Sequence, residues 1–339
     1  MRRVAIVLVV VLGLVGCVAS RAQVTSTETV EADSSAPPAS TVETARATVE
    51  GRILWGDRDK FFLANADGSG VEQLTDPQQY CCVARISPDH SRILTMPGTD
   101  ETGAVRGGTL TLQQPARFDL LTQSEATLNL VPEVWSPDGS RIAFEGWDDT
   151  DPNRTGIYTA SSADGADLQR VTTVAGPAHD SALDYSPDGQ RLVFYRAVRG
   201  EPDFPIDIGG SLWIVNVDGS DSHQLDTGSV RPWGWARWSP DGSKIVFGAE
   251  RLQPTGGLWT IKPDGSSLTV LVPGSASHFP VGPIWSPDGD AVMFSMNPNN
   301  DDFDHPDNEI DVVSADGTGL TTVVGGTGYK RLSDWWKDS

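Results

Sequence analysis

Lysine is scarce in this sequence, and positive charge in general is outnumbered. The 339 residues contain 25 Lys and Arg, of which five are Lys, against 46 Asp and Glu, so the net charge is −21. No run of basic residues occurs anywhere in the chain. Because nucleic-acid binding depends on clustered positive charge, the composition excludes DNA or RNA as a probable class of partner.

Catalytic sequence motifs are also missing. The chain has no Gly-x-Ser-x-Gly elbow, no His-Glu-x-x-His pair, no phosphate-binding loop and no dinucleotide fingerprint. Its five His are scattered. These absences favour a protein that binds without turnover, with no cofactor; a divergent lyase or hydrolase site assembled from distant segments stays as an alternative.

Long apolar runs are absent beyond the first residues. Arg2 and Arg3 precede the twelve apolar residues Val4–Val15, which are too few for the ~20 that cross a bilayer. A charged start and a short apolar run indicate an export signal. The following Leu14-Val15-Gly16-Cys17 resembles the lipobox of bacterial lipoproteins, which implies a signal peptide over residues 1–16 and a lipid on Cys17. The alternative is an ordinary secretory signal cut elsewhere, leaving Cys17 discarded or free.

Residues 17–50 contain no aromatic residue and consist largely of Ala, Ser, Thr, Val and Glu. Such a composition cannot bury enough apolar surface to fold, so it predicts a disordered tether. Together these segments predict an exported protein, held on the extracytoplasmic (periplasmic) side of a bacterial membrane only through its lipid.

The rest of the chain is repetitive. Ser-Pro-Asp-Gly begins at Ser136, Ser186, Ser239 and Ser286, and a variant, Ser-Pro-Asp-His, begins at Ser87, with steps of 47 to 53 residues. A second signal, Asp-Gly, occurs at Asp67, Asp164, Asp218, Asp264 and Asp316. Pro fixes φ, Asp tolerates turn conformations and Gly supplies positive φ, so both signals predict tight turns.

The segments between these turns are short alternating strands. Four antiparallel strands per repeat is the pattern of one propeller blade. The repeats open at Gly51 on a segment that matches a second strand, and residues 329–333 match a first strand. We therefore predict an all-β, six-bladed β-propeller over residues 51–339, with one blade completed by the C-terminal strand.

The repeat Trp-Ser-Pro-Asp-Gly, followed by an Ile-x-Phe-type strand and a strand ending in Asp-Gly, resembles the TolB-type (WD40-like) propeller repeat. This resemblance implies an extracytoplasmic, non-catalytic interaction protein of the cell envelope. Related propellers also cover serine peptidases and form the body of some carbohydrate lyases, so the fold alone does not decide the function.

Propeller geometry places the short turns on one face and the long loops on the other. The five long loops carry 14 acidic residues and 5 Arg, so we expect a cationic, metal-bridged or polar partner on the loop face. Trp233, Trp235, His179 and His278 should lie on the same rim. Either the two Trp stack on a sugar or a peptide side chain, or they only pack between blades.

Three Arg precede the recurring aromatic position of a first strand: Arg85, Arg237 and, in the closing strand, Arg331. They predict either an anion site near the channel or ion pairs with neighbouring turn Asp residues.

Adjacent Cys81 and Cys82 suggest either a strained vicinal disulfide or two thiols that are reduced or paired elsewhere. Asp149, Asp151 and Asn153, and Asn297 to Asp302, space oxygen ligands like the start of a calcium loop but lack its Gly and Glu, so solvated acidic loops are the alternative.

Three functions are compatible with these observations: binding of an envelope protein or polymer, sensing of a carbohydrate or metal ligand, and a divergent propeller lyase or hydrolase. The oligomeric state is not predicted.

Overall fold

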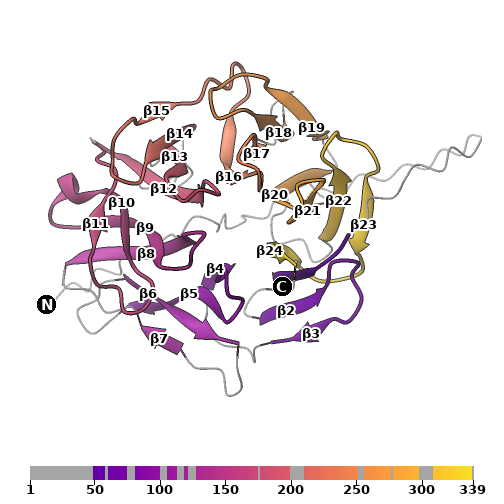
Figure 1. Cartoon of the computed structure of the whole chain (residues 1–339), viewed down its shortest axis with the longest axis horizontal. Helices are drawn as coiled ribbons and strands as arrows, with labels where there is room; N and C mark the ends of the chain where they lie inside the picture. The colour runs from indigo at the N-terminus through magenta and orange to yellow at the C-terminus, as the bar shows by residue number, and fades with distance from the viewer. Residues whose placement is uncertain are drawn as a thin grey trace, which may run out of the picture.

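The chain forms a closed ring of six four-stranded antiparallel sheets around a central channel (Figure 1). The computed structural model describes residues 49–57, 60–74, 81–99, 105–112, 118–120, 127–174, 176–198, 210–250, 256–275, 278–297 and 308–337. The predicted signal peptide, Cys17 and the tether up to residue 48 lie outside these ranges. The predicted fold class is confirmed.

Each sheet is one blade, and its first strand lies next to the channel. Blade 1 contains β24 (Arg331–Trp336), β1 (Arg52–Asp57), β2 (Lys60–Asn65) and β3 (Glu72–Gln73). Blade 2 contains β4 (Cys81–Ile86), β5 (Arg92–Thr99), β6 (Val105–Thr111) and β7 (Phe118–Leu120), and blade 3 contains β8 (Leu128–Trp135), β9 (Arg141–Asp148), β10 (Gly156–Ser161) and β11 (Gln169–Arg170). Blade 4 contains β12 (Ala178–Tyr185), β13 (Arg191–Val198), β14 (Gly210–Asn216) and β15 (His223–Gln224), and blade 5 contains β16 (Pro232–Trp238), β17 (Ile245–Ala249), β18 (Gly257–Ile261) and β19 (Thr269–Pro273). Blade 6 contains β20 (Phe279–Trp285), β21 (Ala291–Asn297), β22 (Glu309–Ser314) and β23 (Thr321–Val324). A short 3-10 helix, η1 (Pro152–Arg154), lies in blade 3.

The ring closes as predicted, because the C-terminal β24 pairs with β1. The register corrects one detail of the repeat alignment. Trp335 pairs with Ile53 in the way that Trp135 pairs with Ile142, so Trp335 holds the recurring aromatic position. The residue before it is Asp334, and the prediction that Arg331 is the equivalent of Arg85 and Arg237 is wrong. The alignment slipped because the closing strand ends in two Trp and lacks the Ser-Pro-Asp-Gly turn that marks the register elsewhere.

The core consists of separate hydrophobic clusters, each of which joins neighbouring blades. The aromatic residue at the end of a first strand packs against the second strand of the preceding blade, as Trp135 does against Leu94. Its indole Nε1 also donates to the carbonyl oxygen of Arg85, at 3.0 Å. The recurring Trp residues therefore have a structural role.

A second aromatic layer is formed by cross-strand partners on the second and third strands. Four blades have a pair of aromatic residues there: Trp55 with Phe62, Phe144 with Tyr158, Phe194 with Trp213, and Phe247 with Trp259. Blade 2 has Thr95 opposite Gly108, and blade 6 has Phe294 opposite Asp311. Each of these two blades has a buried side-chain oxygen without a hydrogen-bond partner: Thr95 Oγ1 in blade 2 and Asp311 Oδ1 in blade 6.

Replacing Thr95 with valine should raise the free energy of unfolding by about 1 kcal/mol, because it removes a fully buried hydroxyl that has no partner. Urea denaturation at pH 7 measures this change. In the control, Thr172→Val, the lost hydroxyl accepts the amide of Ile157 at 2.8 Å, so stability should fall instead. A loss of stability in Thr95→Val would contradict the prediction.

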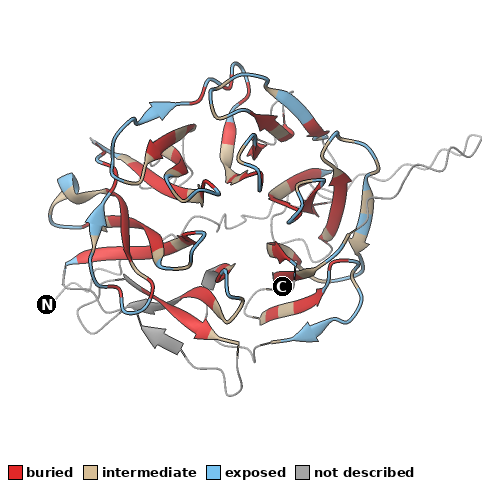
Figure 2. Ribbon diagram, viewed as in Figure 1, coloured by how far each residue is buried: buried red, intermediate tan, exposed pale blue. Residues whose placement is uncertain are grey.

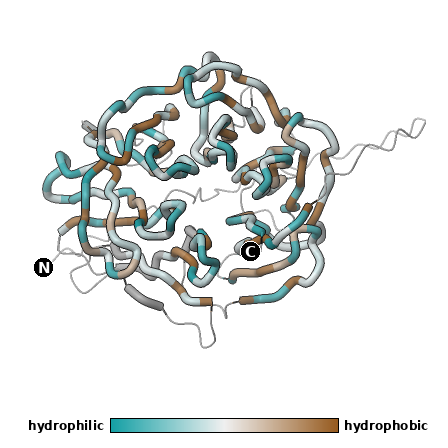
Figure 3. Tube along the Cα trace, in the orientation of Figure 1, coloured by the Kyte–Doolittle hydropathy of each residue, from teal (hydrophilic) through white to brown (hydrophobic). Residues whose placement is uncertain are grey.

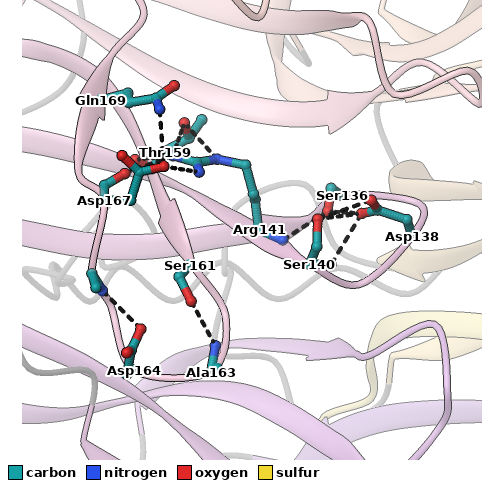
Figure 4. A network of polar contacts seen from close by, with 11 residues as sticks. Ser136, Asp138, Ser140, Arg141, Thr159, Ser161, Ala163, Asp164, Asp167 and Gln169 are labelled. Atoms are coloured by element: carbon teal, nitrogen blue, oxygen red, sulfur yellow. Dashed lines mark hydrogen bonds and ion pairs between the residues drawn. The ribbon is translucent and has the colours of Figure 1, made fainter.

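The five Ser-Pro-Asp-Gly-type turns, one in each of blades 2 to 6, interlock around the channel. Within each turn the Ser hydroxyl donates to the Asp carboxylate two residues later, as Ser136 does to Asp138 at 2.6 Å (Figure 4). Each turn Gly lies beside the Pro of the preceding turn: a Cβ on Gly139 would lie 3.5 Å from Cδ of Pro88. These Gly residues have φ near +70°, which favours glycine.

The ring of turns changes at its seam between blades 1 and 2. His90 occupies the Gly place with φ 58°, and its imidazole lies 5.4 Å from the Trp336 ring, centroid to centroid. An aromatic contact therefore replaces the Pro–Gly contact at the junction between β24 of blade 1 and the turn of blade 2.

Hydrogen bonds to these turn carboxylates make stability depend on pH. Donation by the Ser87 hydroxyl lowers the pKa of Asp89 to about 2, and the same contact lowers the pKa of Asp138, Asp188, Asp241 and Asp288. A carboxyl group with a depressed pKa in the folded state stabilises the fold above its unfolded pKa, ~3.9, and this contribution is lost as the pH falls through the folded pKa.

We therefore expect the turn carboxylates to lower the urea midpoint as the pH falls from about 4 to 2. Denaturation curves at stepwise pH measure this dependence. A midpoint that stays unchanged down to pH 2 would contradict it.

In blades 1 and 3 to 6, burial decreases from the middle strands to the outer strand (Figure 2). The outer strands β3, β11 and β15 are exposed, and the turns near the channel are hydrophilic (Figure 3). Within the ranges that the structure describes, no helix has the length and apolar character to cross a membrane.

Candidate functional site

Every first strand carries a register shift in its pairing with the second strand, just before its last two or three residues. Such β-bulges turn side chains away from the regular alternation of a strand. Four charged residues occupy the place just before the recurring aromatic position in their blades: Arg85, Asp184, Arg237 and Asp334. We call these four residues the channel cluster.

The two acids of the channel cluster join neighbouring blades in the same way. Asp184 accepts the backbone amide of Trp238 at 2.9 Å, and Asp334 accepts that of Ile86 at 3.1 Å. In both cases the amide belongs to the aromatic position of the next blade. These acids therefore fix the spacing of the first strands at two of the six blade junctions.

The two Arg of the channel cluster converge on the closing strand. Arg85 Nη1 donates to the Ser333 carbonyl oxygen at 2.7 Å, and Arg237 Nη2 lies 3.5 Å from the same oxygen. Arg237 Nη1 also pairs with Asp184 Oδ1 at 3.4 Å, with 11% and 17% of the two side chains exposed. Arg237 thus forms an ion pair, but its partner is an acid in a strand and not the turn Asp that the sequence suggested.

Burial dominates the electrostatics of the channel cluster. Desolvation lowers the pKa of Arg85 to about 9, and the nearby charge of Arg237 lowers it further, while Asp334 and Asp184 oppose the shift. Desolvation also raises the pKa of Asp184, against the attraction of Arg237. Arg85 Nε is buried without a hydrogen-bond partner. Arg85 is therefore a desolvated cation with unused donor capacity.

The channel cluster lies in a cavity of about 220 Å³ at the turn-face end of the channel. The cavity is lined by Arg85, Ile86, Ser87, Pro88, His90, Val134, Trp135, Ser136, Pro137, Asp184, Tyr185, Arg237, Asp334 and Trp336. The sequence argument expected binding on the opposite, loop-rich face. The sequence did contain a signal for this site: Asp184 holds the same place in its repeat as Arg85 and Arg237 hold in theirs.

A second buried acidic pair, Glu133 and Glu145, was missed from the sequence. Ser181 Oγ donates to Glu145 Oε2 at 3.1 Å, and Glu133 Oε2 is buried without a partner. Desolvation and the neighbouring Glu145 raise the pKa of Glu133 well above its usual value. Burial and the like charge of Glu145 therefore both disfavour ionisation of Glu133.

On the loop-face side, Trp233 and Trp235 form an aromatic cluster with Phe279 of the next blade. The centroids of the two indole rings lie 5.5 Å apart in a T-shaped arrangement, and Trp233 lies 5.9 Å from Phe279. Trp235 has φ 39° and follows Gly234 with φ 55°. A bulky side chain in this region is strained, and both Trp remain partly exposed.

The remaining predicted residues do not join these two sites. His179 is buried in β12 and His278 is exposed just before β20. Arg331 begins β24 opposite Gly56 and is close enough to Arg85 to lower its pKa. Cys81 and Cys82 begin β4, but their side chains lie outside what the structure describes, so the vicinal disulfide stays a prediction.

The proposed calcium ligands of blade 3 are engaged in local hydrogen bonds. Asp151 Oδ1 caps η1 by accepting the backbone and side-chain amides of Asn153, and Asp149 accepts the side-chain amide of Asn129 at 3.3 Å. Among the residues described, no group of three or more His, Cys, Asp or Glu side chains is placed to hold a metal. The blade 6 candidate loop lies mostly in residues 298–307, outside the described ranges.

Three comparisons with known proteins relate this geometry to a family. Putative TolB from Agrobacterium tumefaciens is 20% identical, with a TM-score of 0.59, over 84% of this chain and 99% of that chain. TolB from Acinetobacter baumannii is 18% identical, with a TM-score of 0.60, over 84% of this chain and 66% of that chain. Both likenesses concern the fold.

One curated relative matches over 142 residues at 26% identity, the uncharacterized peptidase YuxL of Bacillus subtilis. The match covers 39% of this chain and 18% of that protein, so the chain spans less than a fifth of its relative's length. The model of the TolB beta propeller domain matches residues 57–337, which include all or part of every strand of the ring. The chain therefore belongs to the TolB β-propeller domain family.

Proposed function

We propose that the protein is an exported, lipid-anchored binding module that holds a segment of an envelope protein or polymer without turnover. The observation that carries this proposal is the channel cluster: two Arg and two Asp, largely buried, that line an open cavity. The resemblance of residues 14–17 to a lipobox and the tether-like composition up to residue 50 support the anchoring.

The size of the cavity favours a macromolecular partner. Sites that enclose a small organic ligand usually measure about 300–1,000 Å³, and this cavity has about 220 Å³. It suits one or two side chains, or a chain end, inserted from a larger surface. Aromatic walls formed by Trp135, Tyr185 and Trp336 supply apolar contact, while Arg85 supplies donors. The absence of hydrolase motifs from the sequence supports binding without turnover.

The repeat provides a matched experiment on this cavity. Pro88 and Pro137 are exposed turn residues that line it, whereas Pro187 and Pro240 hold the same place in turns that do not. Tagged full-length protein is crosslinked in its native cells, and recovered partners are identified by mass spectrometry. P137K should reduce partner recovery at least tenfold, and P240K should leave it unchanged.

Two outcomes would refute the proposed function. One is the recovery of no protein or polymer above that from untagged cells. The other is equal recovery from P137K and the unmodified protein, once thermal melts have shown that both variants fold.

The strained aromatic cluster favours a second candidate function, the binding of a carbohydrate on the loop face. Backbone strain at partly exposed Trp235 is the specific observation, because strained residues often lie at ligand sites. A panel of envelope sugars tested by thermal shift should raise the melting temperature, and W235A should remove the response. A flat response across the panel would exclude this function.

A further inference from the structure

Asp311 occupies a position where four other blades have an aromatic ring. It lies opposite Phe294 in blade 6, where the equivalent cross-strand residues are Phe62, Tyr158, Trp213 and Trp259. The side chain is 5% exposed, and its Oδ1 accepts no hydrogen bond. A buried carboxylate oxygen without a donor is costly. Its presence at an otherwise aromatic position suggests that the oxygen has a ligand when the protein functions.

Two further oxygen-bearing groups lie beside Asp311. Glu309 precedes it by two residues in β22 and therefore lies on the same face of the strand. The Thr322 hydroxyl on β23 hydrogen-bonds the Asp311 carboxylate and lies 3.5 Å from Glu309 Oε2. Two carboxylates on β22 thus meet the Thr322 hydroxyl of the neighbouring strand β23, which brings three possible oxygen ligands together.

The charge at this place is not compensated by Lys or Arg. Within the described ranges, neither Asp311 nor Glu309 forms an ion pair with a basic side chain. The imidazole of His278, from the connection between blades 5 and 6, lies close enough to Asp311 to act against the rise in its pKa. Glu309 and Thr322 are more accessible than Asp311, so the site is open on one side.

We propose that Asp311, Glu309 and Thr322 bind a hydrated divalent cation of the calcium type. Carboxylate and hydroxyl oxygens are hard ligands, which calcium prefers, and a zinc centre would need more nitrogen or sulfur donors. Two carboxylates and one hydroxyl leave several coordination positions to water, because no group of three His, Cys, Asp or Glu side chains is placed to hold a metal in the described part of the chain. Such a site should be weak, with a Kd between about 0.1 and 1 mM.

This site is distinct from the cavity of the proposed function. It lies between the third and fourth strands of blade 6, whereas the channel cluster lies on first strands. Bound calcium would join β22 to β23 and supply the positive charge that Asp311 and Glu309 lack. The inference therefore stands or fails independently of any partner that docks at the channel.

The test is calcium titration of metal-free full-length protein at pH 7, followed by calorimetry and thermal shift. The unmodified protein should bind calcium with a Kd between about 0.1 and 1 mM. Its melting temperature should be higher in calcium than in its absence. D311N, which keeps the size of the side chain but loses its charge, should weaken binding at least tenfold. D311F, which restores the aromatic pair with Phe294, should abolish binding and still fold.

A matched control is D151N, which removes a carboxylate from the acidic loop of blade 3. It should bind calcium like the unmodified protein if blade 6 holds the ion. The proposal is overturned if no saturable binding occurs up to 10 mM calcium (about ten times the weaker limit). It is equally overturned if D311N and E309Q bind as well as the unmodified protein, or if D151N alone loses the ion.

Discussion

Replacing Lys330 with methionine is expected to lower the free energy of unfolding by about 3 kcal/mol. The Lys330 side chain is buried, and its ammonium group donates to four backbone carbonyls, those of Asn308, Gly326, Thr327 and Gly328, at 2.8 to 3.2 Å. Methionine fills a similar volume but donates nothing, so four carbonyl oxygens lose a charge-assisted partner. Urea denaturation at pH 7 measures the change.

The control for this variant is Lys337→Met. Lys337 pairs with Glu50, and 59% and 66% of the two side chains are exposed. Because exposed ion pairs contribute little, this change should cost less than about 1 kcal/mol. Equal losses in the two variants would show that the carbonyl cage around Lys330 has no special importance.

Trp335→Ala should destabilise the protein by about 3 to 5 kcal/mol, a large part of the total stability of a typical domain. Trp335 is 5% exposed and packs with Ile53, Met293 and Leu332, which come from blades 1 and 6. Its indole Nε1 also donates to the Glu50 carbonyl at 2.9 Å. The substitution therefore weakens the closing strand on both of its sides, and thermal or urea unfolding measures the loss.

Trp335→Phe separates the two contributions. It retains an aromatic ring in the cluster and removes the hydrogen bond, so it should cost clearly less than the alanine variant. If the alanine variant loses less than about 1 kcal/mol, ring closure does not depend on this side chain.

The ring architecture was predictable because its signals recur at a fixed period. Each Ser-Pro-Asp-Gly turn was recognisable from residue types alone, and five turns in register define the blades. At the seam the period ends, and there the register of Arg331 was wrong by three residues. A strand that carries no turn signal of its own is aligned only by its pairing, which is a tertiary contact.

The channel cluster was only partly predictable. Arg85 and Arg237 stood out in an acidic chain, but their relation to Asp184 and Asp334 depends on which side chains the bulges turn toward the channel. Asp311 was missed because one acid in a strand attracts no attention until register shows the aromatic residues at equivalent places. Exceptions to a repeat were therefore more informative than the repeat itself.

The position of β1 inside its sheet has a mechanical consequence. The chain enters the ring at Glu50, beside Lys337, which follows β24. It continues into β1, which is hydrogen-bonded to β24 on one side and to β2 on the other. A pulling force on an N-terminal anchor would reach a strand held along both edges, not an outer strand that can be peeled away. The same pairing that completes the ring would then let the propeller resist tension from the membrane to which we propose it is attached.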